Sequence, residues 1–280
     1  MADITVEYVD HYLDDLAVAN AARVSFDKRS DWAVPAGMDH QGMFTTAQLS
    51  DRDTRLIQFL ARGCEKGDWD RHIDDLTYAD RNACTGADAR EEVEQLVKHL
   101  RQMPTHWAPF AHPHITLRET VPIFVARQRF KHKIGFVESE VSRRYVDSEP
   151  EFYEPAVWRK RGENKKQGSS SEGVDPKVTW FDPQGGYSES LSYVYKEAMQ
   201  DLLQLYQHML EGGVCPEQAR MVLPQSMMTT YQVTGSLYAY AQLYNARTYP
   251  GAQGEIKDLA TKIAAIIEPL YPVSWRSLTS

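Results

Sequence analysis

The sequence has few cysteines and no long apolar run. Its three cysteines, Cys64, Cys84 and Cys215, lie far apart, and their odd number leaves at least one unpaired, so we interpret them as reduced thiols of a cytoplasmic protein. No apolar stretch approaches the roughly 20 residues that a membrane-spanning helix needs. The N-terminal segment, Met1 to Val9, contains acidic residues and no basic start before an apolar stretch, so we expect no signal peptide.

The chain also lacks an excess of positive charge and a glycine-rich phosphate loop. Its formal net charge is −8 at pH 7, which argues against a general nucleic-acid binder, because phosphate backbones attract a net basic surface. No Rossmann or Walker pattern of glycines is present. An anionic ligand must therefore meet a local cluster of basic side chains.

Apolar periodicity predicts an α+β fold in a single catalytic domain that spans residues 1–280. Residues Ile115 to Val125 alternate between apolar and other side chains, which predicts a strand around an interruption at Pro122 and places a sheet near residues 110–130. Five stretches have helical periodicity, and the second and third are expected to be surface helices: Leu16 to Val24, Thr54 to Arg62, Ala89 to Gln102, Leu191 to Met209 and Ile256 to Ile267.

Two polar segments are expected to lie at the periphery. Residues 35–100 are polar and rich in turn residues, which is typical of a tolerated surface insertion. Residues 160–175 include two consecutive lysines and three consecutive serines, which favours a mobile surface loop.

The strongest chemical signal is the stretch from Arg127 to Arg144, RQRFKHKIGFVESEVSRR, which carries six Lys or Arg residues directly after an apolar run. One interpretation is a cleft in which Arg and Lys side chains bind phosphate or carboxylate. The other is a solvated face with internal ion pairs, and the charge pattern alone favours this second interpretation.

Two further patterns are weak. His106, His112 and His114 suggest zinc, but no cysteine lies nearby and the segment is rich in Pro and aromatic residues, so no metal site is expected. Ser142 and His132 suggest a hydrolase, but no Gly-x-Ser-x-Gly turn surrounds the serine.

The stretch from Pro122 to Tyr145, PIFVARQRFKHKIGFVESEVSRRY, resembles the signature of the flavin-dependent thymidylate synthases. Other blocks resemble the same family and follow its order along most of the chain, and together they favour a ligand-binding cluster over a solvated face. These blocks are LAVANAARVSF (Leu16 to Phe26), HWAPFAH (His106 to His112), ARMVLP (Ala219 to Pro224), Thr234-Gly235 and NARTYPGAQGEI (Asn245 to Ile256).

The resemblance implies reductive methylation of dUMP to dTMP with FAD, NADPH and methylene-tetrahydrofolate, in a homotetramer. It implies catalytic roles for Arg247, beside the uracil ring, and for Ser142, as a hydrogen-bond partner of the nucleotide. The dUMP contacts that it implies are Gln128, Lys131, Glu140, Ser142, Arg144, Arg220 and Arg247. The FAD contacts that it implies are Ser25, His106, Lys131, His132, Lys133, Ser236, Tyr238 and Gln242.

A fixed cation at the N3 and O2 edge of uracil would stabilise negative charge as it develops, and this would activate C5. The helical, aromatic C-terminal third, with Tyr238, Tyr240, Tyr244 and Tyr249, is expected to offer apolar surface to neighbouring subunits.

The sequence departs from the family pattern mainly on the expected flavin side. The family's Arg-His-Arg is Lys131-His132-Lys133, which keeps the charge and loses the planar guanidinium forks. One extra residue separates Lys131 from Ser142. Two alternatives therefore stay open: a flavin- and folate-dependent hydroxymethylase of a pyrimidine nucleotide, and a nucleotide-binding homologue without catalysis.

Overall fold

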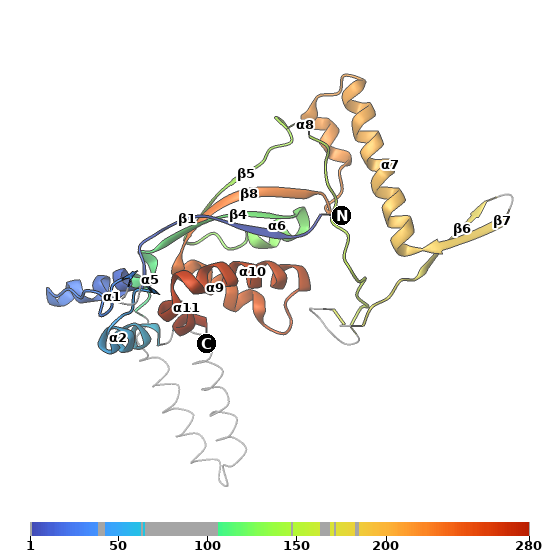
Figure 1. Cartoon of the computed structure of the whole chain (residues 1–280). Helices are drawn as coiled ribbons and strands as arrows, with labels where there is room; N and C mark the ends of the chain where they lie inside the picture. The colour runs from blue at the N-terminus through green and yellow to red at the C-terminus, as the bar shows by residue number, and fades with distance from the viewer. Residues whose placement is uncertain are drawn as a thin grey trace, which may run out of the picture.

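The computed structural model describes residues 2–38, 43–62, 64, 106–146, 148–162, 169–170, 172–182 and 185–279. Its centre is a four-stranded antiparallel sheet with helices against one face, which confirms the predicted α+β class (Figure 1). The strands, in spatial order, are β1 (Thr5–Tyr12), β4 (His114–Pro122), β8 (Met228–Ser236) and β5 (Phe136–Glu140). The covering helices are α9 (Leu237–Thr248), α10 (Gly254–Leu270) and α11 (Pro272–Thr279).

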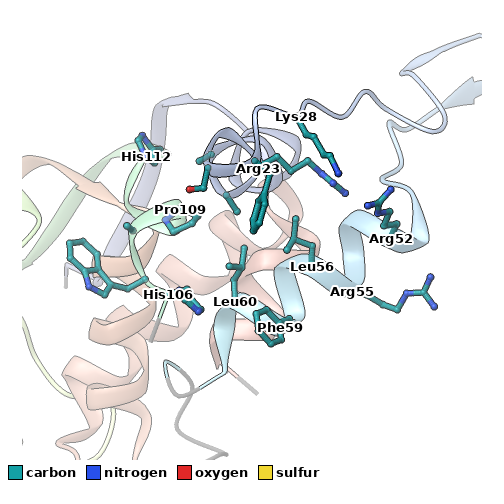
Figure 2. Close-up of a pocket in the computed structure, with 16 residues that line it drawn as sticks. Arg23, Lys28, Arg52, Arg55, Leu56, Phe59, Leu60, His106, Pro109 and His112 are labelled. Atoms are coloured by element: carbon teal, nitrogen blue, oxygen red, sulfur yellow. The ribbon is translucent and has the colours of Figure 1, made fainter. Parts of the chain in front are cut away.

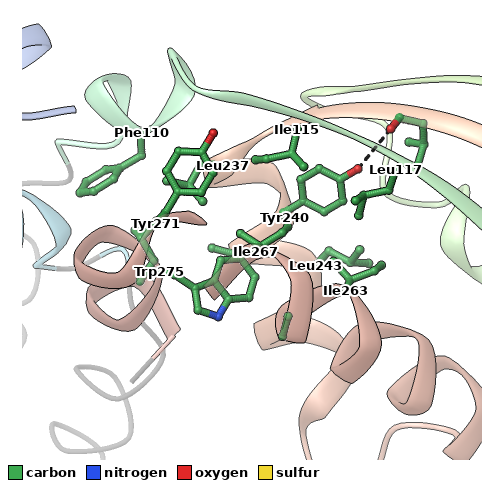
Figure 3. Packing of buried hydrophobic residues seen from close by; sticks show 14 of the residues in the cluster. Phe110, Ile115, Leu117, Leu237, Tyr240, Leu243, Ile263, Ile267, Tyr271 and Trp275 are labelled. Carbon is green, nitrogen blue, oxygen red and sulfur yellow. Dashed lines mark hydrogen bonds between the residues drawn. The ribbon is translucent and has the colours of Figure 1, made fainter. Parts of the chain in front are cut away.

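The core fills the space between the sheet and these helices (Figure 3). Alternation along β4 places Ile115 and Leu117 on the helix-facing side, where both are fully buried. They face Leu237 and Tyr240 of α9, and Ile263 of α10 lies behind them. Burial of each such side chain stabilises the fold by about 1.5–3 kcal/mol relative to exposure.

The apolar run after Pro122 is a helix, so the predicted strand through Val125 was wrong beyond Pro122. Strand β4 ends at Pro122 and α6 (Ile123–Arg129) begins at the next residue. The N–H groups of Ile123 and Phe124 donate to backbone carbonyls of the segment before β8, which satisfies two donors of the first turn. A run of four apolar residues is too short for its periodicity to separate a buried helix from a buried strand.

Helix α2 (Asp51–Ala61) belongs to the core, whereas the sequence predicted a surface helix within a peripheral insertion. Its residues Ile57 and Leu60 are buried where α2 packs against α1 (Asp15–Arg23) and α11. The expectation of a peripheral segment is therefore wrong for residues 51–61. Cys84 and the helix predicted over Ala89 to Gln102 lie outside the described residues.

Helix α7 (Leu191–Glu211) confirms the helix predicted from the apolar periodicity of this stretch. It projects from the body of the protein, beside the hairpin of β6 (Lys177–Asp182) and β7 (Gly185–Ser190) (Figure 1). Tyr206 is its one buried side chain. The small remaining elements are β2 (Gly37–Met38), β3 (Phe44–Thr45), α5 (Ala108–Ala111), α8 (Pro216–Ala219) and the short 3-10 turns Val24–Phe26 and Arg220–Val222. None of the described helices combines the length and hydropathy that a membrane crossing requires.

A buried ion pair fastens α6 to the sheet. Arg129 is 1% exposed and Glu119 of β4 is fully buried. The guanidinium Nε lies 3.1 Å from one carboxylate oxygen of Glu119, and the hydroxyl of Tyr231 donates to that carboxylate at 2.6 Å. The ring of Phe136 lies 4.2 Å from the guanidinium carbon, so β4 and β5 contact Arg129, and Tyr231 of β8 contacts its partner Glu119.

Three of the four tyrosines expected to offer apolar surface to neighbouring subunits pack in or against the core of one chain. Tyr240 is fully buried, and Tyr238 and Tyr244 pack against the core. Strongly exposed apolar side chains lie instead in and around β5, where Ile134 is 95% and Val137 is 65% exposed.

Candidate functional site

The first candidate site is a cavity of about 1010 Å³ between α1, α2 and α5, which we call the α2 cavity (Figure 2). Ser25 and His106, two of the residues predicted to contact FAD, line it. The imidazole of His106 stacks on Phe59 with ring centres 6.0 Å apart. Tyr238 contacts the same wall, because its ring lies 5.8 Å from that of Trp107. The structure therefore brings three predicted FAD residues to one region.

The Asp53 carboxylate connects segments that surround the α2 cavity. Asp53 accepts hydrogen bonds from Arg23 at 2.5 and 2.8 Å, from Ser30 at 2.8 Å and from Ser50 at 2.6 Å. Burial alone would raise the pKa of Asp53, but the hydrogen bonds from Ser50, Arg23 and Ser30 lower it overall. Asp53 is thus a buried carboxylate that joins α1, the following loop and α2.

A second cavity of about 810 Å³ lies between β5 and α8, and we call it the β5 cavity. Glu140, Ser142 and Arg220, all predicted to contact dUMP, line it. Arg144 lies beside it, because its guanidinium pairs at 2.5 Å with Glu217 of the cavity wall. Three further arginines line the cavity, which makes it suitable for a phosphate: Arg118, Arg127 and Arg143.

Arg247 and His132 meet at a third place, where the last turn of α9 reaches the end of α6. The Nε–H of Arg247 donates to Nε2 of His132 at 2.9 Å, and its Nη2 donates to the carbonyl of Gln128 at 3.3 Å. Burial, together with the charges of Arg247 and Arg129, lowers the pKa of His132 to about 4. His132 is therefore neutral at pH 7, and its Nε2 can accept a hydrogen bond from the guanidinium.

A series of hydrogen-bonded side chains links Gln128 to Arg159. The amide of Gln128 donates to the Gln253 side chain, which donates to Glu255 at 2.9 Å. Arg159 contacts both oxygens of Glu255 at 2.7 Å. Burial alone would raise the pKa of Glu255, but the hydrogen bonds from Arg159 and Gln253 lower it overall. Arg159 directly precedes the predicted mobile loop, and Lys160 and Glu172 at the base of that loop are joined by a backbone hydrogen bond of 2.9 Å.

The other residues predicted to contact FAD make separate contacts within the chain. Lys131 and Lys133 are exposed, and Lys133 pairs with Glu138. Ser236 is 6% exposed, and its hydroxyl accepts the N–H of Ala239 at 3.2 Å as the N-cap of α9. Gln242 donates to the carbonyl of Cys64 at 3.1 Å.

Most of the predicted residues thus fall into three groups within one chain: the α2 cavity, the β5 cavity and the Arg247 cluster (Gln128, His132 and Arg247). Lys131, Lys133, Ser236 and Gln242 lie outside these groups. The sequence prediction missed several polar residues at or beside these places: Lys28, Arg52, Arg55, Glu217, Gln253 and Glu255. Only Gln253 and Glu255 lay inside a block quoted for the family resemblance.

The fold and its basic cavities define an α+β protein with nucleotide-sized sites. The family described as thymidylate synthase complementing protein matches residues 8–273 of the chain. A flavin-dependent thymidylate synthase of Thermus thermophilus is 33% identical over 183 residues, which are 65% of this chain and 61% of that protein. One of Thermosipho melanesiensis is 33% identical over 193 residues, which are 69% of this chain and 79% of that protein. The chain therefore belongs to the thymidylate synthase complementing protein family, the flavin-dependent thymidylate synthases.

Among solved structures, the UMP/dUMP methylase PolB from Streptomyces cacaoi, bound with 5-Br dUMP, is similar with a TM-score of 0.62. The alignment covers 99% of this chain and 94% of that chain at 22% sequence identity. This likeness shows a shared fold. The match to the Thermus thermophilus protein spans 61% of that relative's length.

Proposed function

We propose that the protein converts dUMP to dTMP by reductive methylation, with FAD as its cofactor and with NADPH and methylene-tetrahydrofolate as co-substrates. The observation that carries the proposal is the β5 cavity, where Glu140 and Ser142 of one segment meet Arg220 of a distant segment. These were the residues that the family motif assigned to the nucleotide. Five arginines in or beside the cavity offer bidentate donors to a phosphate, and Glu140 and Ser142 offer hydrogen-bonding groups to sugar or base.

The α2 cavity fits a flavin cofactor in size and chemistry. Its walls combine aromatic and apolar side chains with a basic rim, and its volume of about 1010 Å³ lies at the upper end of ligand pockets. Ser25 and His106 would hold the cofactor there. When bound, FAD would supply the hydride that reduces the transferred carbon, while the protein would orient it and exclude water.

Arg247 would stabilise negative charge on the uracil ring. Its Nε–H is engaged by neutral His132, and Gln128 accepts from Nη2, so the guanidinium is held in place before a ligand binds. A neutral imidazole suits this task, because a protonated His132 would repel the guanidinium and could not accept its hydrogen bond.

The proposal includes a homotetramer in which neighbouring copies complete each site. The three groups of site residues occupy separate places in one chain, and this supports sites built from more than one copy. The exposed apolar side chains around β5 support a subunit contact there: Ile134, Val137, Val141 and Tyr145. Light scattering at micromolar concentration should give a tetramer, and a monomer would contradict this part of the proposal.

The test of the reaction is tritium release from C5-labelled dUMP by full-length protein supplied with NADPH and methylene-tetrahydrofolate. We expect release, a yellow protein and a product with the mass of dTMP. Arg247→Ala should reduce turnover about a hundredfold and leave bound flavin unchanged, since loss of one fixed charged donor is typically worth roughly 3 kcal/mol. Arg247→Lys should recover turnover only in part, because a point charge cannot make both contacts.

Other results of the dUMP assay would identify a different function. A hydroxymethyl product mass would identify the alternative enzyme, and a colourless, inactive protein would identify a binding homologue. UMP is tested beside dUMP, because the similar Streptomyces cacaoi protein is a UMP/dUMP methylase. Turnover of Arg247→Ala within about twofold of the unaltered protein would remove Arg247 from the active site.

A further inference from the structure

The α2 cavity has an uneven distribution of charge. Figure 2 shows Arg23, Lys28 and Arg52 at one end, His106 at the other end, and Leu56 and Leu60 between them. Arg55 extends from α2 at the basic end. No aspartate or glutamate lines the cavity within the described part of the chain. This local excess of positive charge stands out in a protein whose formal net charge is −8.

Three of these cations are available to a ligand. Arg23 is neutralised by its ion pair with buried Asp53. Among the described residues, Lys28, Arg52 and Arg55 have no acidic hydrogen-bond or ion-pair partner. Three like charges on one rim repel one another, so an anion that binds between them relieves that repulsion.

Hydrogen bonds hold the segments that carry Lys28, Arg52 and Arg55. Asp53 joins Arg23, Ser30 and the start of α2, as described above. Ser30 is held a second time, because its N–H donates to Asn20 at 2.7 Å and its carbonyl accepts from Asn20 at 3.1 Å. The N–H of Lys28 donates to the carbonyl of Arg23 at 3.2 Å. The backbones that carry Lys28, Arg52 and Arg55 are therefore positioned before a ligand binds, which lowers the entropic cost of binding.

We infer that Lys28, Arg52 and Arg55 form a subsite for the phosphates of a cofactor whose aromatic ring lies toward Phe59 and His106. The ligand class is an aromatic dinucleotide, because the cavity of about 1010 Å³ exceeds what a nucleoside monophosphate fills, and guanidinium groups bind phosphate oxygens in pairs. FAD and the reduced nicotinamide dinucleotide share this chemistry. This inference rests on the proposed function and adds to it a binding role for α2, which the sequence placed at the periphery.

The experiment measures binding to the full-length protein by equilibrium dialysis. The test variant is Arg52→Gln/Arg55→Gln, and Arg52→Lys/Arg55→Lys keeps the charge. Lys257→Gln is the matched control, because Lys257 is an exposed residue of α10 that does not line the cavity. Riboflavin, which has the flavin ring without phosphate, is compared with FAD, and NADH is compared with NADPH. Circular dichroism confirms that each variant is folded.

We expect the test variant to bind one dinucleotide about tenfold more weakly or worse, since hydrogen bonds between charged groups are stronger than those between neutral groups. The Lys variant should lose less, and the control should bind normally. A loss for FAD without a loss for riboflavin assigns the subsite to FAD. A loss for NADPH or NADH with FAD unchanged assigns it to the nicotinamide dinucleotide, and a loss confined to NADPH points to its extra phosphate.

Two results would overturn the inference: dinucleotide affinities within about twofold of the Lys257→Gln control, or an equal loss for riboflavin and FAD. These results are distinguishable from failure of the proposed function. An unaltered protein that makes dTMP while the variants bind normally keeps the function and removes the subsite. An unaltered protein that makes no dTMP while the variants lose affinity keeps the subsite and removes the function.

Discussion

Removal of the Glu119 carboxylate should destabilise the protein more than removal of any surface acid. Glu119 is fully buried, and it is the acidic partner of Arg129, which is 1% exposed. In Glu119→Ala the guanidinium stays buried with its charge uncompensated, and the hydroxyl of Tyr231 loses the acceptor that it contacts at 2.6 Å. Breaking a buried pair in this way typically costs about 3–5 kcal/mol. For a domain of this size we therefore expect a melting temperature lower by roughly 6–20 °C.

The assay is urea unfolding followed by circular dichroism, at one protein concentration because subunit association contributes to stability. Glu268→Ala is the matched control, since Glu268 pairs with Arg276 on the surface, where both side chains are largely exposed. An exposed pair is worth about 0–1 kcal/mol, so the control should change little. The double variant Glu119→Leu/Arg129→Met should recover most of the lost stability, because apolar groups of similar volume can replace a buried pair.

The reasoning is refuted if Glu119→Ala costs no more than Glu268→Ala. It is also refuted if the double variant is as unstable as Glu119→Ala, because the cost would then come from packing or from the unpaired Tyr231 hydroxyl and not from an uncompensated charge. In either case the ion pair would not be what fastens α6 to the sheet.

Two further perturbations test the described contacts. His132 has a pKa of about 4 when folded and an ordinary pKa near 6.5 when unfolded, so between these values the unfolded chain binds more protons and stability should fall as pH falls. His132→Gln should flatten this part of a urea-unfolding pH series, and an unchanged slope would exclude His132 as its cause. Asp15 accepts the N–H groups of Val273 and Ser274 at 2.8 and 3.0 Å in the first turn of α11, so Asp15→Ala should cost about 1–3 kcal/mol in urea unfolding. Asp15→Asn retains one acceptor and should cost less, and equal losses would contradict the capping role.

Local sequence was sufficient where a periodic pattern was long. The stripe in Leu191 to Met209 predicted α7, and the stripe in Ile256 to Ile267 predicted α10, because each covers three or more helical turns. The family resemblance likewise depended on motifs within short segments, and the family match over residues 8–273 confirms it. Shorter patterns had mixed outcomes: those in Leu16 to Val24 and Thr54 to Arg62 predicted α1 and α2, whereas the run after Pro122 was predicted as strand and is a helix.

The sequence by itself determined the α+β class, the long helices and the family, because helical and strand periods are set by the local backbone and motifs are read along the chain. Tertiary structure alone decided which distant side chains meet. Arg247 and His132 are 115 residues apart in sequence and share a hydrogen bond. Arg52 reaches the α2 cavity only because the buried side chains of Asp53 and Ile57 hold another face of its helix against the rest of the protein. Burial against partners remote in sequence sets these contacts, and no local pattern encodes it.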